Sequence, residues 1–511
     1  MSRTHRTLEG GNNMKNLWKR TGLALLALFA AVALTACGGG STTDAAGDNG
    51  ATGVVNIMLT DAEGDFTTYT VDVLSLRLTR ADGTRVETLP IMTRVDFAQY
   101  TDMTEFLTAA SVPKGVYKHA TLTLDYSNAD IQVEDANGVA TPVGAIVDAN
   151  GNPVTTLTVD VRLEGVRALP IVPGIPRMLS LDFDLKQSNT VDMTVSPPEL
   201  TVEPVLYAEV DRELDKPQRL RGPLQSVNVN NGTFHLFIHP FHARLATGTR
   251  PFGSVNVHTD DNTYFEIDGQ AYTGADGLAV LALEPKFTGV IVRGFYRLKP
   301  KRFEATEVYA GSSVPGGEMD AATGSVVARN GDTLTLRGVT LQRRDGVVVF
   351  NDTVTVTVAD STIVRKAASI DPYTQLDISV GQRVIVFGTL TSTGSNDLQL
   401  DASNGYVRML FTDLRGKVVA NDPVIDKFDL YLTAINGRNP AIFDFTGTGK
   451  SPAEDAEPGN YELNVGTLDV SPILVGVPVQ ARGFVTPFGS APKDFDATSI
   501  AWSSGLIIIR P

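Results

Sequence analysis

The feature that most constrains the fold of this sequence is a series of tight-turn dipeptides. They separate segments in which apolar and polar residues alternate. Between residues 54 and 511, Asn-Gly or Asp-Gly occurs ten times, first at residue 82 and last at residue 436. These dipeptides readily adopt the positive φ angles of two-residue hairpin turns. The segments between them alternate apolar or β-branched residues with polar ones, as in Val354–Val358, which is the period of a strand with one buried face. The pattern predicts an all-β protein built from antiparallel meanders.

Length and composition narrow the class further. A chain of 511 residues predicts three or four domains, and 42% hydrophobic with 20% charged residues excludes a wholly disordered chain. The single cysteine excludes a disulfide framework and a multi-cysteine metal site. One short helix is also expected, because Asp102 is a suitable cap, Glu105 follows three residues later, and Phe106 and Leu107 supply an apolar side.

The first 36 residues have the features of an export signal. Lys15, Lys19 and Arg20 precede an uncharged stretch over 21–36, and its 16 residues are fewer than the roughly 20 that a membrane-spanning helix needs. Residues 1–13 add nothing that a signal requires, so Met1 and Met14 both stay open as the start. Residues 1–36 are predicted to be a signal peptide and residues 37–53 a flexible tether rich in Gly, Ser, Thr and Asp.

The end of this signal, Leu34-Thr-Ala-Cys37-Gly38, resembles the lipobox of bacterial lipoproteins. The resemblance implies cleavage before Cys37 and acylation of that cysteine, with palmitate-like chains holding the protein to a membrane. Gly38 resembles the second mature residue of lipoproteins sorted to the outer membrane, so the expected location is the cell envelope, and the outer membrane where the host has one. A buried cysteine behind an ordinary signal is the alternative.

Charge argues against one class of partner. Removing residues 1–36 takes away five basic residues and one acidic residue from totals of 43 and 58, which leaves a net charge of −19. Binding to phosphate backbones depends on clustered Lys and Arg. Nucleic acid is therefore excluded as an expected partner.

Residues 54–207 resemble a bacterial family, the domain of unknown function numbered 4382. The resemblance runs through an ordered set of segments: Leu59-Thr-Asp-Ala62, Tyr69–Leu78, Val112–Tyr117, Ala120–Tyr126, Leu179–Leu185 and Val202–Val205. It implies a lipid-anchored exported protein and a β-sandwich, here expected over 54–210, but no reaction.

The rest of the chain repeats itself three times. Gly222, Gly324 and Gly416 each open a unit, and a Val-x-x-x-Gly segment recurs 94 and 95 residues apart, at Val290, Val384 and Val479. A period of about 95 residues indicates tandem small domains rather than a solenoid. The pattern resembles the exported family of unknown function numbered 5666, with OB-like barrels. Three small closed barrels are predicted, over 219–310, 319–409 and 411–504.

Four of the six histidines fall close together, at His235, His239, His242 and His258. On a helix the first three would share a face suited to zinc. The local sequence after Asn231-Gly232 alternates as a strand, on which residues i and i+4 lie about 13 Å apart. The prediction is no metal and no cofactor, with His239, His242 and His258 as the remaining metal candidates.

Three further motifs are interpreted as structural. Gly447–Ser451 ends like a phosphate-binding loop, but Asp444 replaces the first glycine and Pro452 follows where a helix is required. Asp148–Asn152 lacks the glycine and glutamate of a calcium loop, so it is expected to form a turn, as is Asp135–Gly138. Asp61 is expected to cap a turn at the end of the first strand through its own backbone.

No motif for nucleophilic, zinc-peptidase or dinucleotide chemistry is present, and Cys37 is expected to be lipidated. The leading hypothesis is a non-catalytic lipoprotein with a binding or spacer role, with envelope proteins or glycans as possible partners. A carbohydrate-binding lipoprotein and, less favoured, a polysaccharide- or peptide-acting hydrolase are the alternatives. Aromatic residues of the first barrel are candidate contacts, although core packing is the preferred interpretation for them: Tyr264, Phe265, Tyr272, Phe295 and Tyr296.

Overall fold

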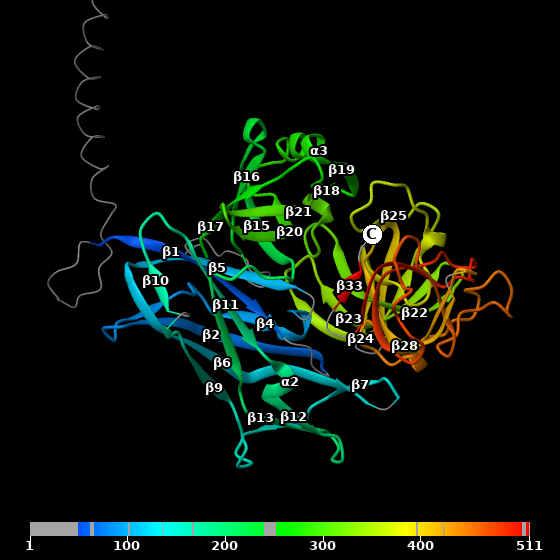
Figure 1. Cartoon of the computed structure of the whole chain (residues 1–511), viewed down its shortest axis with the longest axis horizontal. Coiled ribbons are helices and arrows are strands. Elements are labelled where there is room, and N and C mark those ends of the chain that lie inside the picture. The colour runs from blue at the N-terminus through cyan, green and yellow to red at the C-terminus, as the bar shows by residue number, and fades with distance from the viewer. Residues whose placement is uncertain are drawn as a thin grey trace, which may run out of the picture. The chain divides into compact units, whose positions relative to one another are not determined.

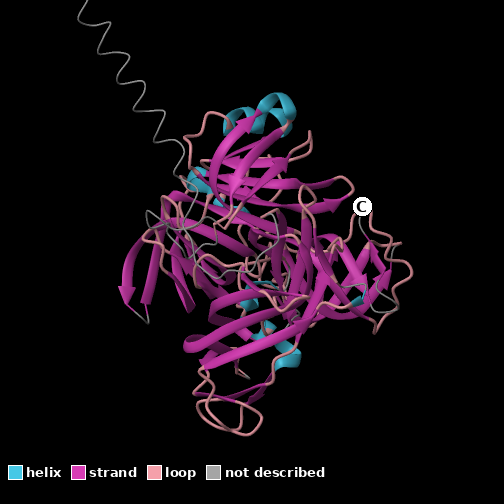
Figure 2. Ribbon diagram, turned by 90° about the vertical axis from the view of Figure 1, so that its left-hand side faces the viewer, coloured by secondary structure: helices cyan, strands magenta, loops and turns pink. Residues whose placement is uncertain are grey.

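The computed structural model describes residues 50–61, 66–100, 103–135, 137–165, 168–239, 252–394, 397–422, 424–502 and 507–509. These residues are mostly strand (Figure 2), which confirms the all-β prediction. The predicted signal peptide and Cys37 lie outside the described residues. In the part of the chain that is described, no helix is long and apolar enough to cross a membrane. Residues Ala51–Pro511 form one compact unit.

A β-sandwich forms the N-terminal part, coloured blue and cyan in Figure 1. One of its layers has the strand order β14 (Leu206–Val210), β11 (Arg177–Phe183), β1 (Thr52–Thr60) and β5 (Thr104–Pro113). The second contains β10 (Leu169–Ile171), β6 (Gly115–Glu134), β2 (Phe66–Arg80) and β3 (Arg85–Glu87), with β4 (Thr93–Asp96), β7 (Ala140–Pro142) and β9 (Thr156–Arg162). A small third sheet contains β12 (Asn189–Asp192), β13 (Glu199–Val202) and β8 (Ala145–Val147). The short helices are η1 (Phe97–Tyr100) and α2 (Leu185–Ser188).

An aromatic cluster packs between the two layers of the sandwich. Tyr69 of β2 lies edge-on to Phe183 of β11, with 6.2 Å between ring centroids, and Phe97 of η1 contacts the same ring at 5.2 Å. All three residues are fully buried. The alternation of each strand therefore places one face in a shared core, as the period of two requires.

The expected short helix after Asp102 is wrong. Glu105, Phe106 and Leu107 belong to β5, which pairs antiparallel with β1. The local capping pattern was outweighed by sheet pairing, because both Phe106 and Leu107 are buried and a strand sends them to opposite faces. Asp102 itself lies outside the described residues.

Three five-stranded barrels follow. Around each barrel the strands lie in the order first, second, third, fifth and fourth, and the fourth strand pairs with the first. The first barrel contains β15 (Gln218–Asn228), β16 (Thr233–Phe237), β17 (Ser254–His258), β20 (Gly289–Leu298) and β21 (Lys301–Ala310). The second contains β22 (Asp320–Asn330), β23 (Thr333–Gln342), β24 (Val348–Thr357), β26 (Arg383–Gly394) and β27 (Asp397–Met409). The third contains β28 (Thr412–Asp422), β29 (Lys427–Ile435), β30 (Tyr461–Asn464), β31 (Pro478–Val485) and β32 (Phe495–Trp502).

In every barrel the third and fifth strands pair in parallel and close the ring. This is the connectivity of an OB-like barrel, so the prediction of tandem OB-like barrels is confirmed. Additional elements decorate the barrels: β18 (Tyr264–Ile267), β19 (Gln270–Thr273), α3 (Gly274–Leu281), β25 (Ile363–Lys366), β33 (Ile507–Ile509), η3 (Val229–Asn231), η4 (Gly311–Ser313), η5 (Gln375–Asp377) and η6 (Pro440–Ile442).

The repeated residues of the sequence are register partners in the barrels. Each opening glycine lies directly opposite the valine that begins the repeated segment, in the pairs Gly222–Val290, Gly324–Val384 and Gly416–Val479. The repeated sequence segments are therefore the places where the first and fourth strands of each barrel pair.

The glycine that ends each repeated segment allows a close approach between strands. A Cβ atom on Gly294, Gly388 or Gly483 would lie 2.0, 2.3 and 2.0 Å from a carbonyl oxygen of the fifth strand. Each of these sites lies at a register shift between the fourth and fifth strands. A bulge at this point bends the strand and helps the barrel to close.

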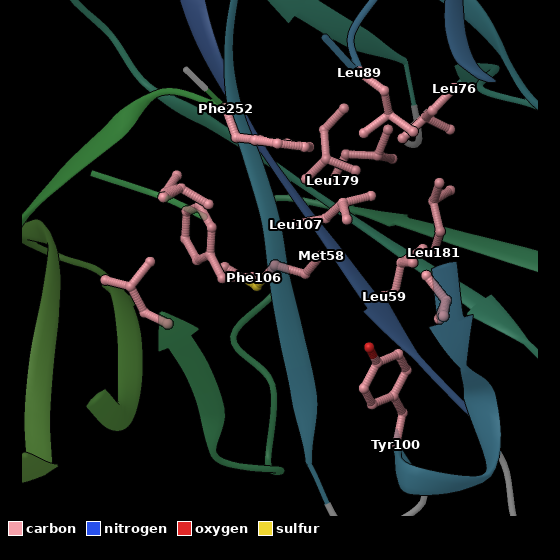
Figure 3. Close-up of a cluster of buried hydrophobic side chains, with 14 of the residues drawn as sticks. Met58, Leu59, Leu76, Leu89, Tyr100, Phe106, Leu107, Leu179, Leu181 and Phe252 are labelled. Atoms are coloured by element: carbon pink, nitrogen blue, oxygen red, sulfur yellow. The ribbon is translucent and has the colours of Figure 1, made fainter. Parts of the chain in front are cut away.

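The sandwich and the first barrel share one sheet. Gln218 and Arg219 of β15 pair in parallel with Thr104 and Glu105 of β5, so the sandwich layer continues into the barrel. The hydrophobic core is also continuous, and Figure 3 shows Met58 and Leu107 of the sandwich beside Phe106 and Phe252. Phe106 packs edge-on against Phe303 of β21 at 6.4 Å.

Buried ion pairs join the remaining parts. Arg408 of β27 donates Nε and Nη2 to Glu266 of β18 at 2.9 and 2.5 Å, and both side chains are at most 3% exposed. Arg438, in the turn after β29, pairs with Glu134 of β6 at 2.5 Å. The barrels and the sandwich therefore contact one another through charged groups, and the division into separately folding domains at the expected boundaries stays a prediction.

Candidate functional site

Two of the clustered histidines, His235 and His258, lie on strands, as their alternating context predicts, and His239 follows the end of β16. His235 is in β16 opposite Asn256, and His258 is in β17 opposite Thr233. His239 is half-buried beside the ring of Phe252 at 6.3 Å, and burial, together with Arg221, lowers its pKa. His242 lies outside the described residues. In the described ranges, no three His, Cys, Asp or Glu side chains are arranged to hold a metal ion.

The calcium-like and phosphate-like segments are turns and a loop. The Asp148 carboxylate accepts hydrogen bonds from the amides of Asn150 and Asn152, and these turn contacts lower its pKa. In the other segment, the Gly449 amide donates to Asp455 and the Lys450 amide to the Ala491 carbonyl. These two backbone amides are engaged within the protein, in line with the interpretation of the segment as a structural loop.

The candidate aromatic contacts of the first barrel divide into two groups. Tyr264, Phe265 and Tyr296 are at most 5% exposed and belong to buried apolar clusters, as core packing predicts. Tyr272 and Phe295 are half-buried, and Phe295 is covered by the guanidinium of Arg297 at 4.9 Å.

Asp61 has a long-range partner rather than the expected local turn. Its Oδ1 accepts a hydrogen bond from the amide of Leu185, the first residue of α2, at 3.0 Å. Lys216 donates Nζ to the Asp61 carbonyl at 2.7 Å, so three distant segments meet here. The side chain is completely buried, and burial raises its pKa to about 8. Asp61 is therefore a structural junction between these segments.

A polar cavity lies where the sandwich meets the first two barrels. Its volume is about 170 Å³, comparable to cavities that hold one small organic molecule. Its polar wall contains Arg94, Asp96, Gln99 and Asp130 of the sandwich, Arg221 of β15 and Gln342 of β23.

An apolar wall faces these groups. Val348, Val349 and Phe350 begin β24, and Tyr100 ends η1 on the sandwich side. The hairpin between β23 and β24 thus contributes both a polar and an apolar part of the site. The combination of apolar surface with a few convergent polar groups is typical of small-molecule sites.

The charged groups of the cavity are held in place by fixed partners. Arg94 pairs with Asp72 at 3.2 Å and donates to the Asn128 carbonyl at 2.7 Å. Glu105 accepts from Nε of both Arg219 and Arg221 at 2.6 Å, and this cluster is almost fully buried. Burial, with the neighbouring Arg219, lowers the pKa of Arg221 to about 10.

Asp96 is positioned as an acceptor with both oxygens engaged. Its Oδ1 accepts from the Tyr69 amide at 2.9 Å and its Oδ2 from Nε2 of Gln99 at 3.0 Å. Gln99 also donates to Thr340 of the second barrel at 3.2 Å, which links the two sides of the cavity. Burial raises the pKa of Asp96.

One residue that lines the cavity has a buried acceptor with no donor among the described residues. The side chain of Gln342 is 9% exposed, and its Oε1 has no hydrogen-bond partner among the described residues. A buried acceptor without a donor is costly unless a ligand or water supplies one. Local sequence patterns did not identify this site, because its residues run from Thr68 to Phe350 and share no motif.

Comparison with known proteins identifies one segment. Residues 52–195 match the family described as "Domain of unknown function (DUF4382)". The match covers most of the sandwich and confirms the resemblance at the N-terminal domain. No curated protein and no solved structure matches the chain.

Proposed function

We propose that this protein is a lipid-anchored extracytoplasmic protein with a non-catalytic role, in which a rigid β body is held to a membrane through Cys37. The lipobox-like Leu34–Cys37 segment supports the anchor. The body serves as a spacer or binding scaffold in the cell envelope, facing envelope proteins or glycans. The expected net charge of −19 after signal removal argues against nucleic acid as a partner.

One observation carries the scaffold role: Ala51–Pro511 is a single compact unit whose parts are joined by buried ion pairs. Flexibly linked domains bury few charges at their contacts, because each buried charge requires a fixed partner. Four β units joined in this way keep a constant separation between the tether and the last barrel. Constant separation is what a spacer or display scaffold requires.

The cavity supports a non-catalytic role. Both oxygens of Asp96 accept hydrogen bonds from fixed donors, which holds the carboxyl in one orientation. Arg94 and Arg221 are engaged with Asp72 and Glu105. Polar groups held in this way suit the binding of a ligand, which supports the proposed role.

The anchor is tested by metabolic labelling with an alkyne-tagged fatty acid. Full-length protein should incorporate the label and run as the processed form. Cys37→Ser should remain as unlabelled precursor, whereas Ser41→Ala in the predicted tether should label normally. Label on the Cys37→Ser variant, or none on the unaltered protein, would refute the lipid anchor.

Carbohydrate binding is the second candidate function, and the cavity is the observation that favours it. The described cavity is small, so it suits a single sugar unit better than an extended polysaccharide.

A further inference from the structure

We infer that the cavity between the sandwich and the first two barrels binds a small neutral polyhydroxylated molecule, a monosaccharide or a cyclic polyol. The inference deepens the binding role proposed above and rests on that role being non-catalytic. It depends on the size of the cavity, its charge balance, its unpaired acceptor and its apolar wall.

Size sets the class of ligand. A volume of about 170 Å³ accommodates a ring of six or so heavy atoms with small substituents. A dinucleotide or an extended peptide is too large. The position between three parts of the fold encloses the ligand on several sides, as expected for a specific site.

The charges around the cavity disfavour an anionic ligand. The charged residues of the wall and their direct partners are three arginines and four carboxylates: Arg94, Arg219, Arg221, Asp72, Asp96, Glu105 and Asp130. The two signs nearly cancel, and Arg94 and Arg221 already contact carboxylates. An anionic ligand would lose its hydration without gaining a new positive partner, because both arginines of the wall already contact carboxylates.

Gln342 selects a ligand that carries hydrogen-bond donors. Its Oε1 is buried and lacks a donor among the described residues, although Thr340, two residues earlier on the same strand face, receives one from Gln99. A hydroxyl group donates to an amide oxygen and accepts from an arginine at the same time. Hydroxyl groups on a ring therefore match the mixture of donors and acceptors in this wall.

The apolar wall fits the C–H face of such a ring. Tyr100 is 5% exposed and belongs to η1, and Phe350 of β24 lines the same cavity. Aromatic and aliphatic side chains bury the C–H groups of a sugar while its hydroxyl groups face the polar wall. Charged comparators such as acetate and methylammonium lack this division.

The test uses full-length protein extracted in detergent and saturation-transfer NMR. The probes are glucose, galactose, N-acetylglucosamine and myo-inositol, with acetate and methylammonium as charged comparators. At least one neutral probe should receive saturation on its ring protons, and the charged comparators should not. Transfer to no neutral probe, meaning that the cavity holds water only, would overturn the inference, as would transfer to the charged comparators alone.

Variants assign the binding to this cavity. Gln342→Leu should weaken binding about ten-fold through loss of one hydrogen bond to a buried acceptor. It should not unfold the protein, because it removes an unpaired polar atom. Val349→Trp should block the cavity, whereas Gln480→Leu, the same change at an exposed position of the third barrel, should leave binding unchanged. Unaltered binding in both Gln342→Leu and Val349→Trp would place the ligand elsewhere and refute the inference.

Turnover distinguishes the two proposals. Incubation with the methyl glycosides of any sugar that binds should release no methanol. Release that is abolished by Asp96→Asn would overturn the non-catalytic role while supporting the cavity as a sugar site. Absence of all binding would overturn the cavity inference and leave the lipid-anchored scaffold unaffected.

Discussion

Asp61 shows how one buried carboxyl couples distant segments to solvent pH. It joins the end of β1 to the first turn of α2, and the neighbouring Lys216 bonds its carbonyl. Burial raises its pKa from 3.8 to about 8, so the folded protein keeps this proton in a pH range where the unfolded chain releases it. Between these pH values the folded state binds more protons, and its stability falls as pH rises.

Replacing Asp61 with Asn should remove most of that pH dependence. The amide oxygen still accepts from Leu185 but does not ionise. When the pH is raised from 5 to 8, the free energy of unfolding should decrease in both proteins. The decrease should be about 3 kcal/mol smaller in Asp61→Asn than in the unaltered protein. Urea titrations at the two pH values measure this difference. Asp148→Asn, an exposed turn carboxylate with a lowered pKa, is the control and should follow the unaltered protein.

At the scale of elements, the repeated bulge of the barrels depends on the absence of a side chain. A Cβ on Gly388 would lie 2.3 Å from the Asp401 carbonyl oxygen, and the fifth strand would have to move. Gly388→Ala should lower the free energy of unfolding by about 3 kcal/mol. Gly459→Ala is the control, since a Cβ there meets nothing within 4 Å. Guanidinium titrations compare the two, and equal midpoints would contradict the role of the bulge.

The turn before the fourth strand differs in one barrel. Phe287, Gly381 and Gly476 occupy the same place, with φ of 75°, 97° and 88°, and each donates its amide to the first strand. The second and third barrels have Val-Gly here and the first has Lys286-Phe287, so Phe287 adopts the backbone conformation of a glycine.

Phe287→Gly should therefore stabilise the protein by about 1 kcal/mol, because a bulky residue in the left-handed region is strained and this side chain is 60% exposed. Gly381→Phe should destabilise the protein. Thermal denaturation monitored by circular dichroism gives both shifts. A lower melting temperature for Phe287→Gly would show that the ring makes contacts worth more than the strain.

At the scale of the whole molecule, buried ion pairs hold the parts together. Arg408→Met leaves Glu266 buried without its ion-pair partner and should destabilise the protein by about 3–5 kcal/mol. The double variant Glu266→Leu with Arg408→Met should recover much of this loss. Arg343→Met, which removes an exposed pair with Asp345, should change stability by less than about 0.5 kcal/mol.

Limited proteolysis of the same variants tests whether the barrels behave as one rigid body or as independent domains. Limited proteolysis should leave residues 311–319 uncut in the unaltered protein, because Ser312 and Ser313 accept hydrogen bonds from Tyr406 and Arg408. Arg408→Met should open this segment to cleavage, as mass spectrometry of the fragments would show. Rapid cutting near 311–320 in the unaltered protein would instead support separate domains.

Sequence patterns predicted the local features and missed the long-range ones. Alternation and the 94- and 95-residue repeats predicted strands and barrels because both depend on near neighbours and on pairing within one unit. Glu105 was assigned to a helix cap, whereas it accepts from Arg219 and Arg221, more than 110 residues away. The cavity was missed for the same reason, since Arg94, Arg221 and Gln342 meet only after three units pack together.

The pairing of β5 with β15 also limits how a gene for such a protein can change. The second and third barrels each close their own sheet, so a duplication or deletion of one of them leaves no unpaired strand edge behind. Recombination between the sandwich and the first barrel would uncover β5 and expose Phe106 to solvent. The sandwich and the first barrel should therefore be inherited together.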